Sequence, residues 1–174
     1  MERLGIARKF ISCAGLGQPI VVCGLTIPQS HISIMSSLCT YTGHCHCGAV
    51  QFQVSAPQQL VVWRCNCSVC IMKQNHHFIV PASHFTLLAG AEVLTEYRFN
   101  TKQARHLFCS VCGVQSFYRP RSNPDGYAVT IYCVDLPATS SYTIQDYDGQ
   151  NWESTYATNA TIKTLSREET YHAS

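Results

Sequence analysis

The chain has 174 residues, of which 46% are hydrophobic and 13% are charged. This length suits one well-packed domain and is short for two, and the apolar content excludes an intrinsically disordered chain. The formal net charge of +2, from twelve basic and ten acidic residues, predicts neither a nucleic-acid interface nor a polybasic membrane patch.

Residues 1–38 differ in character from the rest of the chain. They begin with three basic residues and continue with apolar runs that glycine and proline interrupt. The break at residues 17–19 argues against a secretory signal, a mitochondrial presequence would be poorly amphipathic, and neither run approaches the roughly 20 residues of a membrane span. We therefore interpret residues 1–38 as a flexible extension and residues 39–168 as the domain.

From Tyr41 onward the pattern is typical of short β-strands, in which apolar side chains alternate or cluster between turn residues. Only residues 152–157 suggest a short helix. Strands at this spacing predict an all-β domain, either a sandwich or a barrel-like sheet, with little helix. The expected strands comprise residues 49–54, 60–63, 77–80, 93–99, 105–108, 116–118 and 127–134.

Seven of the eleven cysteines fall into three short clusters. Cysteines this close in sequence rarely form a disulfide with each other, whereas their thiolates readily converge on one ion. We therefore expect metal sites in a reducing compartment, the cytoplasm or the nucleus, instead of disulfide bridges. The clusters are Cys45-x-Cys47, Cys65-x-Cys67-x-x-Cys70 and Cys109-x-x-Cys112.

The spacing within the clusters suits zinc. Tetrahedral zinc holds its thiolate sulfurs about 3.8 Å apart, a separation that a Cys-x-x-Cys turn supplies. The two side chains of a Cys-x-Cys segment emerge on the same face of an extended chain, so they can also chelate one ion. Gly48 and Gly113 follow directly after two of the clusters, where the backbone must turn tightly.

Counting ligands separates two sites. Cys45, Cys47, Cys109 and Cys112 complete a four-thiolate set that joins segments about 60 residues apart, as a structural zinc site does. Three ligands remain, Cys65, Cys67 and Cys70, and three protein ligands with a free position are typical of a reactive zinc.

A histidine would instead close the second site at four ligands, and spacing alone does not decide between the open and the closed form. The histidines near enough in sequence are His44, His46, His76 and His77.

The clusters lie inside longer segments that resemble the family of glutathione-dependent formaldehyde-activating enzymes and centromere protein V. These segments are residues 41–50 (YTGHCHCGAV), 65–70 (CNCSVC) and 108–117 (FCSVCGVQSF). Residues 73–81 (KQNHHFIVP) and 120–124 (PRSNP) look specifically like the animal centromere protein V branch. The resemblance covers roughly residues 40–166.

The resemblance implies a compact β fold that is shared with methionine-R-sulfoxide reductases. It also implies two zinc ions per chain, held by the same two sets of cysteines that the ligand count separates. Residues that match the family's structural zinc ligands are Cys45, Cys47, Cys109 and Cys112. Residues that match its catalytic zinc ligands are Cys65, Cys67 and Cys70.

The resemblance further implies a carbon–sulfur lyase whose partner is glutathione or another small thiol, because family enzymes add glutathione to formaldehyde to give S-hydroxymethylglutathione. Zinc would promote this chemistry by deprotonating a coordinated thiol near neutral pH. His76 and His77 are candidate bases by proximity. Side chains that could steer anionic glutathione are Arg64, Lys73, Arg98, Lys102 and Arg105.

Two other functions compete with the lyase. The resemblance to centromere protein V suggests a non-catalytic zinc module that associates with chromatin or the cytoskeleton, although residues 1–38 lack the basic, proline-rich character of the chromatin-associated members. A methionine sulfoxide reductase would need a separate nucleophilic cysteine near its C-terminal end, and Cys133 is the one candidate. We expect no direct nucleic-acid contact and no membrane association.

Overall fold

The structure, a computed structural model, describes residues 38–171. The expected extension, residues 1–38, lies outside the described residues except for Leu38, which is the first residue of β1. The strands are β1 (Leu38–His44), β2 (Gln51–Pro57), β3 (Gln59–Cys65), β4 (His76–Pro81), β5 (Phe85–Ala89), β6 (Leu94–Tyr97), β7 (Arg105–Cys109), β8 (Phe117–Arg119), β9 (Gly126–Thr130) and β10 (Ser141–Tyr147). The α-helices are α1 (Ser68–Lys73), α2 (Trp152–Thr158) and α3 (Glu168–Tyr171).

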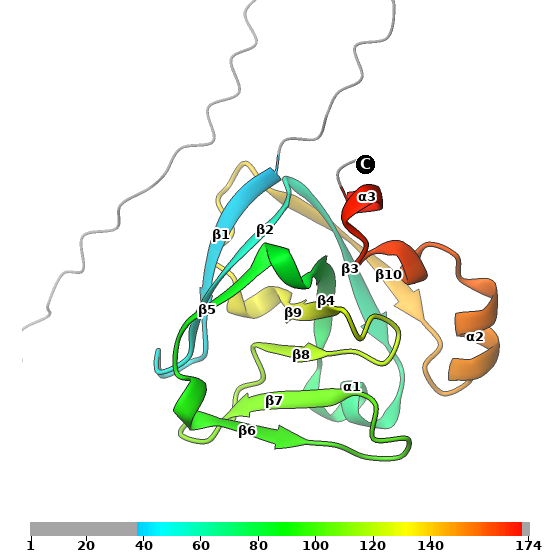
Figure 1. Cartoon of the computed structure of the whole chain (residues 1–174), viewed down its shortest axis with the longest axis horizontal. Coiled ribbons are helices and arrows are strands. Elements are labelled where there is room, and N and C mark those ends of the chain that lie inside the picture. Colours follow the sequence, from blue (N-terminus) through cyan, green and yellow to red (C-terminus); the bar gives the residue numbers. More distant parts are fainter. Residues whose placement is uncertain (1–37, 172–174) are drawn as a thin grey trace, which may run out of the picture. The chain divides into compact units, whose positions relative to one another are not determined.

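The strands form two sheets, which confirms the predicted all-β class. The smaller sheet has the order β1-β2-β5, and the larger has the order β10-β3-β4-β9-β8-β7-β6. All the pairings are antiparallel except that of β10 with β3, which is parallel over its whole length. Figure 1 shows the larger sheet curving from β3 and β10 down to β6, with β1, β2 and β5 beside it. No helix within the described residues is long and apolar enough to span a bilayer.

The main core lies between the two sheets. Alternate residues of β1 and β2 point inward, as the period of two in a strand requires, and Phe52 of β2 is fully buried. Its ring stacks on Phe85 at 5.5 Å between centroids and meets the edge of Phe117 at 5.6 Å. These aromatic contacts join the smaller sheet to β8 of the larger one.

The larger sheet is buried on both faces at its centre. In β4, Phe78 and Val80 belong to the core between the sheets, whereas Ile79 packs on the opposite face with Trp63 of β3 and Tyr118 of β8. Consecutive residues of a strand point to opposite faces, so the continuous apolar run of β4 is the pattern of a central strand covered on both sides. The second face carries the candidate site described below.

The predicted elements agree with the structure in most positions, and the differences follow from side-chain contacts. The strand expected over residues 127–134 ends at Thr130, after which residues 131–133 form a 3₁₀ turn. The hydroxyl of Thr130 lies 2.9 Å from Asn75 Oδ1 and 2.8 Å from the carbonyl oxygen of Gln115, which ties the end of β9 to neighbouring segments. The helix predicted over residues 152–157 is present as α2.

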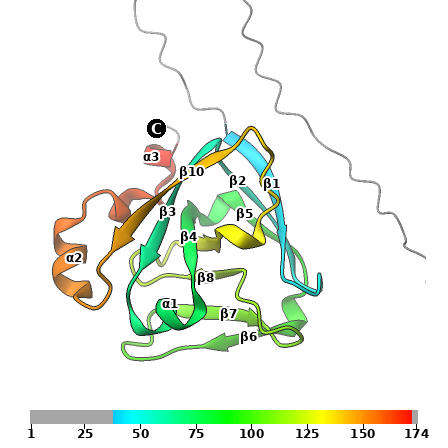
Figure 2. The ribbon, with the colours of Figure 1, turned by 180° about the vertical axis from the view of Figure 1, so that it is seen from behind.

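Five strands and α-helices within the described residues have no counterpart among the sequence predictions: β1, β5, β10, α1 and α3. The helix α1 has only six residues and no side-chain N-cap, so it lacks the usual start signal. The strand β10 is exposed at six of its seven positions, so it shows no alternation of buried and exposed residues. In Figure 2, β10 runs alongside β3, and this parallel pairing of distant segments leaves no local mark in the sequence.

Substituting Phe52 by alanine tests the packing between the sheets. Phe52→Ala removes a fully buried ring and leaves a cavity, so we expect the free energy of unfolding to fall by about 3–5 kcal/mol. Leu88→Ala, on a side chain that is 56% exposed in β5, is the control and should change it by about 0.5 kcal/mol or less. Urea denaturation of the zinc-loaded protein measures both, and equal losses would contradict the assigned core.

Candidate metal centres and the adjoining pocket

Four cysteines from two distant turns meet in one cluster. Cys45 and Cys47 come from the turn after β1, and Cys109 and Cys112 come from the turn after β7. Their four sulfurs lie within 4.8 Å of one another, with Cys45 Sγ 3.5 Å from Cys47 Sγ and Cys47 Sγ 3.7 Å from Cys109 Sγ. These separations are close to the roughly 3.8 Å between thiolates on tetrahedral zinc. The donor set and its spacing therefore fit a zinc ion.

Both turns have the same backbone construction. Gly48 and Gly113 have φ angles of 78° and 74°, in the left-handed region that favours glycine. The N–H of Gly48 donates to the carbonyl of Cys45, and that of Gly113 donates to the carbonyl of Cys109, at 3.0 and 2.8 Å. The N–H of Val50 also points at Cys45 Sγ at 3.3 Å, as expected for a turn that offers N–H groups to thiolates. The tight turns predicted from the two glycines are confirmed.

The remaining three cysteines form a second cluster at the end of β3. Cys65 is the last residue of β3, Cys67 precedes α1, and Cys70 lies inside α1 and is buried. Their three sulfurs also lie within 4.8 Å of one another, and the N–H of Cys67 donates to Cys65 Sγ at 3.4 Å. We call Cys65, Cys67 and Cys70 the trio. Its three sulfur donors also fit a zinc ion.

The three thiols of the trio differ in pKa. Hydrogen bonds from the thiols of Cys65 and Cys70 lower the pKa of Cys67 to about 2. The same contacts, with Cys67 as the thiolate partner, raise the pKa of Cys65 to about 11 and also raise the pKa of Cys70. The trio therefore carries a thiolate at neutral pH, and a cation bound there would displace the protons that Cys65 and Cys70 retain.

The histidines considered as a fourth ligand have other contacts. His76 Nδ1 lies 2.8 Å from the hydroxyl of Tyr132, and His77 Nε2 lies 3.0 Å from the hydroxyl of Tyr118. His44 Nδ1 lies 2.8 Å from the carbonyl oxygen of Cys45, and His46 is exposed. Among the described residues, no histidine, aspartate or glutamate has a donor atom grouped with the three sulfurs of the trio.

The loop after β10 holds the trio from one side. The side chain of Asn66 donates to Asp148 at 3.0 Å and accepts from the N–H of Gln150 at 2.9 Å. Gly149, between these two residues, lies so close to the trio that a Cβ at this position would collide with Cys65 Sγ and lie 2.9 Å from Cys67 Cβ. Only glycine therefore allows this loop to approach the trio.

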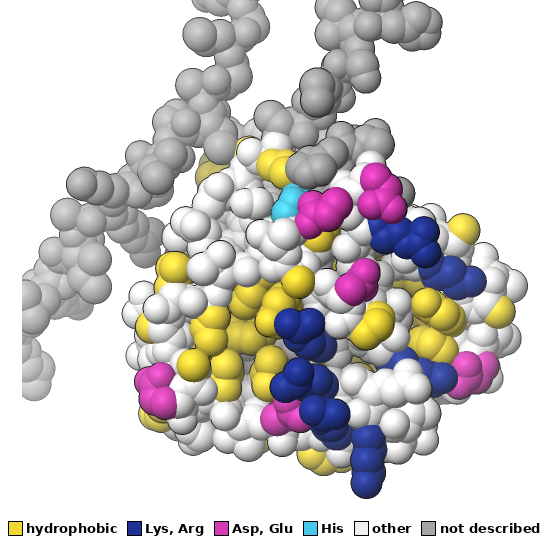
Figure 3. All heavy atoms as spheres, viewed as in Figure 1, with side chains coloured by type: hydrophobic (Ala, Val, Ile, Leu, Met, Phe, Trp, Pro, Cys, Tyr) yellow, Lys and Arg dark blue, Asp and Glu magenta, His cyan; other side chains and the backbone are white. Residues whose placement is uncertain are grey.

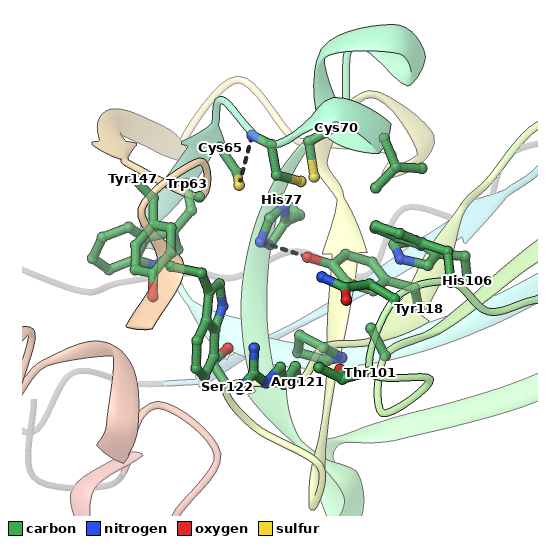
Figure 4. A pocket seen from close by; sticks show the side chains of 18 of the residues that line it. Trp63, Cys65, Cys70, His77, Thr101, His106, Tyr118, Arg121, Ser122 and Tyr147 are labelled. Carbon is green, nitrogen blue, oxygen red and sulfur yellow. Dashed lines mark hydrogen bonds between the residues drawn. The ribbon is translucent and has the colours of Figure 1, made fainter. Parts of the chain in front are cut away.

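An aromatic pocket of about 140 Å³ opens beside the trio, on the face of the larger sheet that points away from the smaller one. Figure 4 shows Cys65 and Cys70 at one end of the pocket, Arg121 and Thr101 at the other, and His77 between them. The aromatic side chains that line it are Trp63, Phe99, Tyr118, Tyr147 and Trp152. Such a lining excludes water from a bound molecule and strengthens polar interactions within the pocket.

Two buried polar groups line the pocket near the trio. Burial lowers the pKa of His77 to about 4 and raises the pKa of Tyr118 well above its usual value, so both side chains are neutral at pH 7. Asn75 fixes the far side of the imidazole, with Nδ2 at 3.4 Å from His77 Nδ1 and 4.0 Å from Cys70 Sγ. His106 stacks on Tyr118 with ring centroids 5.0 Å apart. The result is a fixed, uncharged pair of proton-bearing side chains.

Comparisons with known proteins show the family to which this chain belongs. The family model described as "Glutathione-dependent formaldehyde-activating enzyme" matches residues 40–150. The chain belongs to this family. A crystal structure of a protein from Rhodobacter sphaeroides is 32% identical, covers 59% of this chain and 99% of its own, and superposes with a TM-score of 0.50. The family match contains all seven clustered cysteines.

The five cations considered for steering lie outside the aromatic pocket of this formaldehyde-activating-enzyme domain. Arg98 and Arg105 both pair with Glu96, and Arg98 also donates to the carbonyl of Lys102. Arg64 forms two hydrogen bonds to Asp146, and Lys73 donates to Gln115. On the face seen in Figure 3, a short row of basic side chains has acidic side chains beside it.

The cation that does line the pocket is Arg121, which was not among the residues that we expected to bind glutathione. It lies in the PRSNP segment, residues 120–124, which resembles the animal centromere protein V branch, and this position in a motif was the available signal. Of the two candidate bases, only His77 lines the aromatic pocket. His76 lines a separate, more polar cavity of about 410 Å³, which Cys65 and Cys70 also line.

Paired cysteine variants test the two clusters. Cys109→Ser breaks the cluster that joins the two turns, so we expect the loss of that zinc and unfolding of a domain whose stability is of the order of 5–15 kcal/mol. Cys67→Ser changes the trio alone, so we expect a folded protein with one zinc per chain instead of two. Circular dichroism and metal analysis by mass spectrometry measure both. Equal collapse of the two variants would contradict separate structural and open sites.

Proposed function

We propose that this protein is a zinc-dependent carbon–sulfur lyase that interconverts S-hydroxymethylglutathione with glutathione and formaldehyde. The observation that carries the proposal is the trio of thiols at the end of an aromatic pocket, in a chain that belongs to the glutathione-dependent formaldehyde-activating enzymes. Cys65, Cys67 and Cys70 would supply three ligands to a zinc ion, which could then take a further ligand from the pocket.

In this proposal the two cysteine clusters have different tasks. Cys45, Cys47, Cys109 and Cys112 hold a structural zinc, and Cys65, Cys67 and Cys70 hold a catalytic one. Zinc at the trio would lower the pKa of an added thiol and fix the orientation of its sulfur. Because three thiolates already donate charge to the ion, its power as a Lewis acid is modest, and the neighbouring side chains gain importance.

The reaction forms a bond between the thiol sulfur and the aldehyde carbon, while the carbonyl double bond becomes a single C–O bond. The proton of the thiol ends on the aldehyde oxygen. Tyr118 and His77 line the pocket and are joined by a hydrogen bond of 3.0 Å, so they are placed to hold a proton or to donate to the developing alkoxide. Their neutral state at pH 7 leaves Tyr118 with its proton.

The aromatic lining of the pocket would also lower the barrier of the proposed reaction. A thiol and formaldehyde form their S-hydroxymethyl adduct reversibly in water. A catalyst can accelerate this reaction by holding the two reactants together. Trp63 and Tyr147 meet edge to face with centroids 6.1 Å apart and are both nearly fully buried, so this wall is rigid. A rigid wall restricts the reactants to few orientations, which lowers the entropic part of the barrier.

Exchange spectroscopy tests the proposed activity. With ¹³C-formaldehyde and glutathione, we expect the zinc-loaded protein to accelerate exchange between free and glutathione-bound formaldehyde above the rate in buffer. Cys67→Ser should remove the acceleration while the protein stays folded, because it removes a ligand of the open site. Cys133→Ala, which changes a cysteine outside both clusters, is the matched control and should retain it.

Two results would contradict the proposed activity. If the two-zinc protein gives no acceleration with any small thiol–aldehyde pair, the lyase is excluded and a non-catalytic zinc module is favoured. If Cys67→Ser is as active as the parent, the assignment of the trio as the reactive site is wrong.

A further inference from the structure

Four residues that line the pocket each have a buried polar side-chain atom with no partner among the described residues. One of these atoms, His106 Nδ1, is a donor in only one tautomer of the neutral ring. The other three are donors at neutral pH: Trp63 Nε1, Tyr147 Oη and Arg121 Nε. All three side chains line the aromatic pocket, and Trp63 and Tyr147 are only 2% and 5% exposed. An unpaired buried donor is costly, so donors that converge on one cavity indicate the acceptor atoms of a ligand.

In Figure 4, Tyr147 and Trp63 form the wall between the cysteine end of the pocket and the Arg121 end. A tyrosine hydroxyl carries its proton at neutral pH, so that of Tyr147 is available as a donor.

Apart from the thiols of the trio at one end of the pocket, the charged side chain that lines it is a cation. Arg121 is the one Lys or Arg among its lining residues, and none of these residues is Asp or Glu. Burial lowers the pKa of both His77 and His106, so neither adds a charge at pH 7. Glu153 accepts from Arg121 Nη2 at 2.6 Å, but its side chain is 77% exposed, so water screens its charge and Arg121 Nε is left unpaired.

Arg121 is also held in place before any ligand binds. Its guanidinium lies over the ring of Trp152, with Cζ 3.6 Å from the ring centroid. Trp152 in turn stacks on Tyr156 at 4.5 Å, and the Tyr156 hydroxyl donates to the carbonyl of Ser122 at 3.3 Å. A cation that is already fixed loses little side-chain entropy when it binds a carboxylate.

We propose that Arg121, Tyr147 and Trp63 form a carboxylate subsite, which selects thiols that carry a carboxylate on the same molecule. This inference rests on the proposed function, because it assumes that the thiol sulfur binds at the trio. The sulfur end and the carboxylate end of such a ligand then occupy the two ends of the pocket. A peptide thiol with free carboxylates fits this description, and a neutral thiol does not.

Calorimetric binding to the zinc-loaded full-length protein tests the subsite, with glutathione, its dimethyl ester and S-methylglutathione as probes. We expect glutathione to bind at least tenfold more tightly than the ester, the ratio typical of a hydrogen bond to a charged group. S-methylglutathione cannot give a thiolate, so its binding reports the carboxylate contacts without the sulfur.

Two variants remove single donors. Tyr147→Phe should weaken glutathione binding roughly tenfold and leave the melting temperature unchanged, because the lost hydroxyl has no partner in the folded chain. Arg121→Gln should weaken it by at least as much and reduce the preference for glutathione over the ester. Tyr132→Phe and Arg105→Gln, which change exposed side chains outside this pocket, are the matched controls and should bind like the parent.

The outcomes separate this inference from the lyase proposal. Equal binding of glutathione and its ester, or parent-like binding by Tyr147→Phe, would overturn the subsite even if exchange catalysis were present. Carboxylate-dependent binding of S-methylglutathione without exchange catalysis would support the subsite and reject the lyase. Weak binding by Tyr147→Phe together with a lower melting temperature would assign the hydroxyl a structural role and would also reject the subsite.

Discussion

The convergence of four thiols from two distant turns is the constraint on which the rest of the domain depends. Cys47 and Cys109 are 62 residues apart in sequence, yet their sulfurs lie 3.7 Å from each other. One turn belongs to the smaller sheet and the other follows β7 of the larger sheet. Four thiolates this close would repel one another strongly, so a divalent cation is the natural source of compensation. A metal there ties the two sheets together at the edge of the aromatic core.

The second face of the larger sheet carries the pocket. Because the first face is stabilised by the core between the sheets, alternate residues of β3, β4 and β8 can point the other way and build a pocket. Trp63, His77 and Tyr118 are the residues that do so. The pairing of β10 with β3 then brings Tyr147 opposite Cys65, which places the pocket wall next to the trio. Fold and site are two consequences of the same strand periodicity.

Local features of the sequence predicted the two cysteine clusters well. Cysteine spacing over two or three residues is a local property, and Gly48 and Gly113 report a left-handed backbone wherever they occur in such a turn. The all-β class was also predictable, because buried strands such as β2 alternate with period two. The helix α2 was also predictable, because a short helix depends on residues that are neighbours in sequence.

The pocket could not be predicted, because its parts meet through long-range pairing. Tyr147 lies beside Cys65 only through the parallel β3–β10 ladder. Because β10 has no buried face, the sequence shows no alternating pattern that would predict this strand. Arg121 shows the same limit at the level of one side chain. Arg119, two residues earlier, looks equivalent in the sequence, but its guanidinium binds Tyr127 and Pro124, away from the pocket. Residues two apart in a strand point the same way, but β8 ends at Arg119, and the turn that follows it places Arg121 at the pocket.

X-ray absorption at the zinc edge tests the central claim most directly, because it counts the sulfur atoms around the metal without a variant. With four sulfurs at one site and three plus a lighter atom at the other, the two-zinc protein should show an average of about 3.5 sulfurs per zinc. Saturation with glutathione should raise the average to about four. An average of four sulfurs before glutathione is added, or the scattering pattern of an imidazole ligand, would contradict an open position at the trio.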